Sequence, residues 1–104
     1  MSKIIVNKEN ITEKYEMLYS LVRSVYYEVK ELSKKKPDDA LNKFKVETLN
    51  KILKPVKELM KDEIYFDFLQ LLEVDSLPTN SDATIIIGQY FEMFEQFKMK
   101  YICH

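Results

Sequence analysis

The chain has 104 residues, of which 46% are hydrophobic and 32% charged, and its formal net charge at pH 7 is -1. This composition argues against a disordered chain, because disorder goes with low hydrophobicity and high net charge. A single cysteine excludes a disulfide framework and fits a reducing compartment. No apolar run approaches the roughly 20 residues that span a bilayer, and the N-terminal apolar stretch is too short for a signal peptide. We therefore expect one cytoplasmic domain, residues 1–104, without a membrane segment.

The chain contains one glycine, Gly88. Loops that cradle phosphate, and tight turns between strands and helices, use several glycines, so a P-loop or dinucleotide-binding fold is excluded. Glycine-rich hairpin signals are absent as well. Helices joined by short loops remain, and we expect an all-α fold.

Apolar residues at helical spacing predict a first helix over residues 11–35. Asn10 and Glu13 have the form of a capping box at its start, and Pro37 stops it. Residues 1–9 have β propensity without a partner strand, and they are interpreted either as an arm that packs across the domain or as a frayed end. The stripe of this helix has successive spacings of 4, 3, 4, 3, 4 and 3 and consists of Ile11, Tyr15, Leu18, Val22, Val25, Val29 and Leu32.

A second helix is predicted over residues 39–61, with Asp38 or Asp39 as its cap. Pro55 lies inside this helix and removes one backbone hydrogen bond. Because the apolar stripe resumes in phase after the proline, at Val56, we favour a kink over a break into two shorter helices.

Two further helices are predicted over residues 63–73 and 82–101. The 63–73 segment is apolar nearly all round, which indicates burial on several sides, although alternation of its apolar residues also permits a strand. Gly88 lies inside the last helix, where a close crossing of two helices would explain it. The fold is thus expected to be a small four-helix bundle with one Pro-kinked helix. Its predicted core consists of Leu18, Val22, Val25, Val29, Leu49, Ile52, Val56, Phe68, Leu72, Ile87, Tyr90, Phe94 and Phe97.

Charge is segregated along the chain, although the net charge is close to zero. Residues 30–61 carry ten lysines and five acids, a net charge of +5, whereas residues 62–95 carry eight acids and no cation, a net charge of -8. Three interpretations are open: the two halves neutralise each other locally, two copies associate as a homodimer, or one face recognises a charged partner.

The basic half offers a candidate phosphate-contacting set, and the acidic half a candidate contact surface for a basic partner. Nucleic-acid binding is the weaker interpretation, because acids interrupt the lysines and the chain has one arginine. A solvated lysine face is the structural alternative. The candidate phosphate contacts are Lys43, Lys54, Lys57 and Lys61, and the candidate acidic surface consists of Asp67, Glu73, Asp75, Glu92 and Glu95.

An aromatic set surrounds the lone arginine on the first predicted helix. Tyr19, Arg23 and Tyr26 are spaced four and three residues apart, so they share a helical face, and Tyr27 is adjacent. Tyrosine and arginine are enriched in binding hot spots, and an arginine flanked by aromatic rings also suits a small anionic ligand. The structural alternative is that these tyrosines form the outer wall of the core.

Catalytic residues are scarce. The only cysteine and the only histidine are Cys103 and His104 at the C-terminus, and the chain contains no Glu-x-x-His motif. We therefore expect no enzyme activity, no cofactor and no metal site. The leading hypothesis is a non-enzymatic protein–protein interaction module (an adaptor, inhibitor or regulator) that acts by surface occlusion, with another protein or a second copy as partner. The alternatives are nucleic-acid binding through the lysines and anionic-ligand binding at Arg23.

Overall fold

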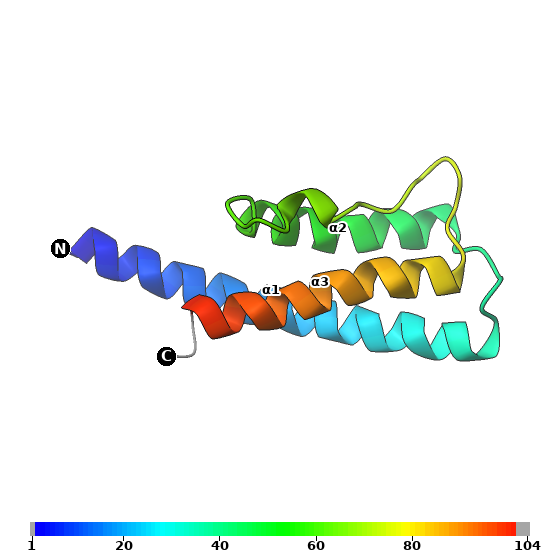
Figure 1. Cartoon of the computed structure of the whole chain (residues 1–104), viewed down its shortest axis with the longest axis horizontal. Helices are drawn as coiled ribbons and strands as arrows, with labels where there is room; N and C mark the ends of the chain where they lie inside the picture. Colours follow the sequence, from blue (N-terminus) through cyan, green and yellow to red (C-terminus); the bar gives the residue numbers. More distant parts are fainter. Residues whose placement is uncertain (1, 102–104) are drawn as a thin grey trace.

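The computed structural model describes residues 2–101, and from residue 13 onward it also describes the side chains. The described part is mostly helical, as predicted, but it holds three α-helices, so a four-helix bundle is not confirmed. The molecule is elongated, measuring 52 × 24 × 23 Å (Figure 1). Its elements in chain order are α1 (Ser2–Lys35), α2 (Lys43–Leu59), a short 3-10 helix η1 (Phe66–Phe68) and α3 (Asn80–Tyr101).

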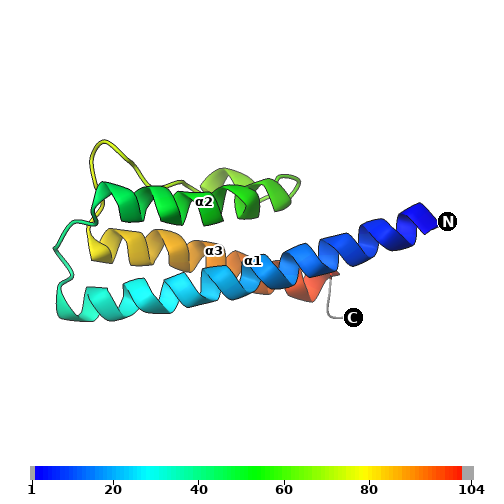
Figure 2. The same ribbon diagram turned by 180° about the vertical axis from the view of Figure 1, so that it is seen from behind.

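α1 runs nearly the full length of the molecule. Its 34 residues correspond to about 51 Å at a rise of 1.5 Å per residue. The helix begins at Ser2 instead of residue 11, and residues 2–9 are helical rather than an arm across the domain. Residues 2–10 contain no proline or glycine that would end a helix. Asn10 and Glu13 therefore lie within α1 and do not cap it. The N-terminal part of α1 projects beyond the ends of α2 and α3 (Figures 1 and 2).

α2 begins later than predicted, at Lys43, because the residues before it pair with the chain ahead of α3. The backbone N–H of Leu41 donates to Pro78, and that of Asn80 donates to the carbonyl of Asp39. Asn42 is the N-cap, and its side chain accepts the N–H of Lys45 at 2.8 Å. Asp38 and Asp39 are therefore not the cap.

α2 also continues through its internal proline. Pro55 lies inside one helix that ends at Leu59, so the prediction against a break into two helices is confirmed. Pro55 removes one backbone hydrogen bond, but the burial of the apolar face stabilises the rest of the helix. Leu53 and Val56, on either side of the proline, belong to this buried face.

The predicted helix over residues 63–73 is wrong. The chain forms turns after α2, then η1, passes through Leu69 in an extended conformation and continues without regular structure to α3. Leu69 and Leu72 are buried, whereas Phe68, which was expected in the core, is 75% exposed. A helix that is apolar nearly all round is stable only when neighbouring elements cover it on several sides. In the irregular segment that forms instead, Leu69 and Leu72 turn inward, while Gln70 and Glu73 face solvent.

A buried amide side chain holds this segment against α2. Asn50 Nδ2 donates to the carbonyl of Leu72 at 2.9 Å, and the N–H of Leu72 donates to Asn50 Oδ1 at 2.9 Å. Asn50 thus satisfies both backbone groups of one residue, as a neighbouring strand would. From the other side, the Tyr90 hydroxyl of α3 donates to the carbonyl of Gln70 at 2.8 Å. The segment is therefore fixed from both α2 and α3.

α3 begins at Asn80, close to the predicted start. Thr79 and Asp82 form a capping box: the N–H of Asp82 donates to Thr79 Oγ1 at 3.0 Å, and the N–H of Thr79 donates to Asp82 Oδ2 at 3.4 Å. The buried side chain of Asn80 donates to the carbonyl of Lys36 at 2.9 Å, which fastens α3 to the end of α1.

α1 packs against both α3 and α2, and the core lies between the three helices. Val25 and Ile52, both predicted core residues, are half-buried at its edge. The largest side chains with almost no exposed surface are Tyr90, Phe94, Leu18, Leu53, Met60, Leu69 and Ile87.

Replacement of Asn50 by alanine tests the role of the buried amide. Asn50→Ala removes two hydrogen bonds and strands a buried N–H and C=O, so we expect the free energy of unfolding to fall by about 2–3 kcal/mol. Urea titration followed by circular dichroism measures this change. Glu47→Ala, an exposed position one turn earlier, should change it by less than about 0.5 kcal/mol. An equally small effect of Asn50→Ala would show that the amide does not hold the segment.

The core tyrosine on α3 makes stability sensitive to alkali. Burial raises the pKa of Tyr90 from 10.0 to about 12, so the unfolded chain loses this proton before the folded chain does. The free energy of unfolding should therefore fall as pH rises from about 10 to 12, and Tyr90→Phe should make the fall shallower. Thermal melts at pH 9, 10 and 11 check this. Parallel curves for the two proteins above pH 10 would contradict it.

Candidate functional site

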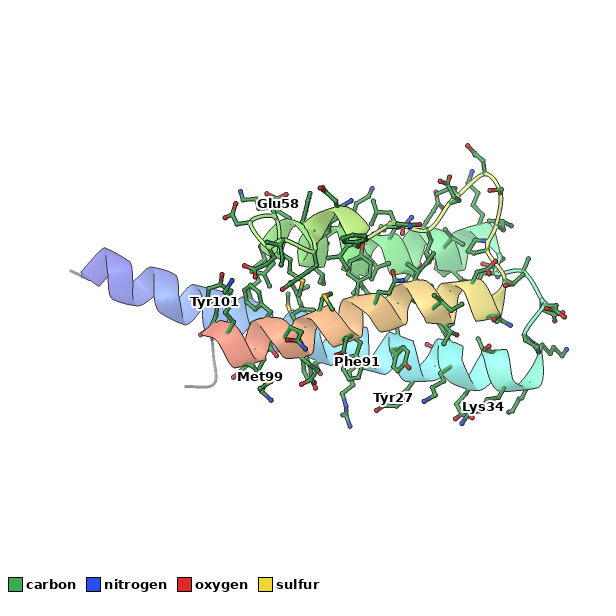
Figure 3. All side chains as sticks on the ribbon, in the orientation of Figure 1. Tyr27, Lys34, Glu58, Phe91, Met99 and Tyr101 are labelled. Atoms are coloured by element: carbon green, nitrogen blue, oxygen red, sulfur yellow. The ribbon has the colours of Figure 1, made fainter. Side chains whose placement is uncertain are left out.

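The predicted aromatic set does come together, and α3 adds a residue to it. Tyr19, Tyr26 and Tyr27 of α1 surround Phe91 of α3, and Arg23 of α1 lies over the Tyr27 ring; we call these five residues the aromatic patch. The ring of Phe91 lies 5.3 Å from that of Tyr26, 5.7 Å from that of Tyr19 and 6.2 Å from that of Tyr27, between centroids. Figure 3 shows Tyr27 and Phe91 near each other where α1 and α3 meet. Nothing in the local sequence pattern around Phe91 indicates this role.

Two of the predicted site residues mainly hold α1 to α3. Tyr19 is half-buried, and its hydroxyl donates to Glu95 Oε1 at 2.7 Å. This hydrogen bond raises the pKa of Tyr19, because it stabilises the protonated hydroxyl. Tyr26 is half-buried as well, and a Cβ placed on Gly88 would lie 3.2 Å from Tyr26 Cε1. Gly88 thus permits the close helix crossing that the sequence suggested.

The other two predicted site residues, Arg23 and Tyr27, face solvent. The Arg23 guanidinium carbon lies 5.5 Å from the centroid of the Tyr27 ring, over which it stacks, and Tyr27 is 46% exposed. Within residues 13–101 no carboxylate forms an ion pair with Arg23. An arginine stacked on an aromatic ring keeps all its guanidinium donors available in a fixed plane. Arg23 and Tyr27 are therefore the accessible part of the patch.

The four lysines of the candidate phosphate-contacting set differ in their surroundings. Lys43 and Lys54 are exposed on α2. Lys57 is half-buried, with its Nζ 5.1 Å from the centroid of the Phe66 ring. Lys61 lies beyond the end of α2 and pairs with Glu58 at 3.3 Å. Two of the four lysines are thus already engaged within the protein.

The acidic residues also divide into free and engaged groups. Asp67, Glu73 and Asp75, in the segment between α2 and α3, and Glu92 on α3 are exposed. Glu95 is instead half-buried and accepts the hydrogen bond of Tyr19, so it belongs to the α1–α3 contact.

The ion pairs do not join the basic half of the chain to the acidic half. Among the described side chains, ion pairs form between Lys34 and Glu31, between Lys61 and Glu58, and between Lys100 and Glu63. None of these links residues 30–61 with residues 62–95. Near the C-terminal end of α3, the Tyr101 hydroxyl donates to Glu63 at 2.6 Å. This bond and the bond from Lys100 hold the pKa of Glu63 below its ordinary value.

A groove that the sequence analysis missed follows the outer side of α3. It consists of three adjoining hollows of about 490, 590 and 400 Å³, which share residues where they meet. Phe68 and Met93 line the first two, and Ile85 lines the second and third. We call this feature the α3 groove. The sequence placed Phe68 in a buried helix, and that error concealed the groove.

The described residues contain no group of three or more His, Cys, Asp or Glu side chains placed to hold a metal ion. Cys103 and His104 lie outside the described residues. None of the helices in the described part is both long enough and apolar enough to cross a membrane. Comparisons of the chain with family models, curated proteins and solved structures found no match.

A double-mutant cycle tests the contact between Gly88 and Tyr26. In an open helix interior, Gly→Ala stabilises by about 1 kcal/mol. We expect Gly88→Ala to gain clearly less than this in the wild-type protein, because the Tyr26 ring must shift. In a Tyr26→Ala background the full gain should appear in urea titration. Tyr27→Ala is the matched control background and should behave as the wild type does. Equal gains in all three backgrounds would contradict the contact.

Proposed function

We propose that the protein is a non-enzymatic interaction module that binds another protein and acts by covering part of its surface. The observation that carries this proposal is the exposed pair Arg23 and Tyr27, with the guanidinium 5.5 Å above the ring and no ion pair to a described carboxylate. Arginine and tyrosine dominate binding hot spots because they combine large contact areas with polar ends.

The surroundings of this pair support binding. Tyr27 rests against Tyr26 at 5.4 Å and Phe91 at 6.2 Å between ring centroids, and Tyr26 is wedged against Gly88. These contacts restrict the rotamers of Tyr27 before any partner arrives. A side chain ordered in advance loses less entropy on binding, so more of the contact energy contributes to affinity.

A second copy is a less suitable partner for this pair than another protein. A twofold interface pairs the same patch of each copy, so an interface centred on Arg23 would bring two Arg23 side chains together. Like charges in a contact are destabilising. A partner that presents carboxylates to Arg23 and an apolar surface to Tyr27 avoids this repulsion. A small anionic ligand would present negative charge to Arg23 but no apolar surface to Tyr27.

Capture from an extract of the native cells tests the proposal. Tagged wild-type protein should retain a partner, and Arg23→Ala/Tyr27→Ala should reduce the retained amount at least about tenfold, since each hot-spot residue contributes about 1–2 kcal/mol. Lys43→Ala/Phe44→Ala is the matched control, because it also removes one exposed cation and one exposed aromatic ring, but on α2.

Both variants alter exposed side chains, so circular dichroism should show unchanged helix content. Equal capture by the wild type and by Arg23→Ala/Tyr27→Ala would overturn the role of the pair. Binding to duplex DNA at low salt that Lys43→Ala/Lys54→Ala abolishes would replace the proposal with nucleic-acid recognition.

A further inference from the structure

The α3 groove exposes large apolar side chains that the fold itself does not cover. Phe68 is 75% exposed and Ile85 is 60% exposed, and both line the same hollow as Met93. Ile64 lines the groove toward the C-terminal end of α3 and is almost fully exposed. Contiguous apolar surface of this kind marks interaction sites in monomeric proteins. Single exposed apolar residues would need no explanation, but these residues line one continuous depression.

The length of the groove matches a helix. Its lining extends along α3 from Asp82 to Lys100, which is about 27 Å at 1.5 Å per residue. An extended peptide of this span would require only about eight residues, but its backbone would need an unpaired strand edge to bond to. α3 offers no free backbone edge, since helical N–H and C=O groups are bonded within the helix. In the segment that forms the other wall, both backbone groups of Leu72 and the carbonyl of Gln70 are already bonded to Asn50 and Tyr90. Side-chain packing by a partner helix of about five turns suits this surface better.

The rim of the groove is acidic. Glu73, Asp82 and Glu92 line it, and its one lysine, Lys100, is paired with Glu63. Asp67 and Asp75 are exposed in the segment that forms the other wall. No described lysine or arginine of the basic half pairs with these acids. The groove therefore presents uncompensated negative charge around an apolar floor.

We propose that the α3 groove binds an amphipathic helix of a partner protein, with an apolar stripe on the groove floor and lysines or arginines facing the acidic rim. Charge complementarity selects this occupant. The same groove on a second copy would bring acidic rims together, which opposes a symmetric dimer through this face. The inference rests on the proposed function, because it names the class of partner, but it uses a surface separate from Arg23 and Tyr27.

Synthetic helical probes test the groove directly. The probe is an 18-residue peptide of leucine and lysine, with leucines at helical spacing on one face, and its binding to the full chain is followed by fluorescence anisotropy. Two control peptides are needed: one with glutamate in place of lysine, and one of the same composition with leucines distributed around the helix. We expect at least about tenfold tighter binding of the first peptide than of either control at low salt.

Matched variants then locate the binding. Phe68→Ala should weaken binding of the leucine–lysine peptide about tenfold, the effect of one hot-spot residue. Phe44→Ala is its control, because Phe44 is 76% exposed but lies on α2 outside the groove. Glu73→Gln/Glu92→Gln should weaken binding about threefold or more at low salt and less at high salt. Because all these side chains are exposed, the thermal midpoints of the variants should stay within a few degrees of the wild type.

Each other outcome overturns the inference. Equal affinity for the three peptides would mean nonspecific attraction, and equal losses in Phe68→Ala and Phe44→Ala would place binding outside the groove. Self-association in light scattering that Phe68→Ala abolishes would make a second copy the occupant.

Arg23→Ala/Tyr27→Ala should leave peptide affinity within about twofold. If partner capture depends on that pair while the peptide fails to bind, the groove inference falls and the proposed function stands.

Discussion

The two hydrogen bonds between Asn50 and Leu72 are the constraint on which the rest of the molecule depends. Both backbone groups of Leu72 are buried, and a buried amide group without a partner is costly. Asn50 supplies both partners from α2, so the chain between α2 and α3 can bury Leu72 without forming a helix or a strand. Elsewhere this segment lies at the surface, and Phe68 within it and Ile85 on α3 are exposed in the lining of the α3 groove.

The groove and the aromatic patch are neighbouring surfaces joined at one contact. Gly88 and Tyr26 both line the groove, and Tyr26 also stacks on Phe91 in the patch. Because Gly88 has no side chain, α1 approaches α3 closely enough for Tyr26 both to line the groove and to stack on Phe91. A single partner protein that contacts both surfaces would bury hot-spot residues at Arg23 and Tyr27 and an apolar helix in the groove. Two surfaces engaged together bind more tightly than either alone.

Sequence periodicity located α1, α2 and α3, although not the starts of α1 and α2, because a long stripe of apolar residues at spacings of three and four is a local signal. It failed where distant residues decide the outcome. Asn50 resembles any polar residue in a helix, and nothing local shows that it will bind Leu72, twenty-two residues away. The choice of Asn42 over Asp39 as the cap of α2 likewise depends on backbone pairing with Pro78 and Asn80. The spacing of Tyr19, Arg23 and Tyr26 did predict the patch, but their division into packed and exposed residues required α3.

The net charge of the chain is close to zero, but it does not show where the charges lie. A partner would contact a groove with an apolar floor and an acidic rim, near Arg23, which forms no ion pair with a described carboxylate. Amide chemical-shift mapping by NMR, with the labelled protein and the leucine–lysine helix, is the most direct test of this surface. A groove that binds basic helices predicts the largest shifts at residues 65–69 and at residues 84–93, with the Gly88 amide as a central reporter. Shifts concentrated on the lysines of α2, or spread evenly over the chain, would contradict it.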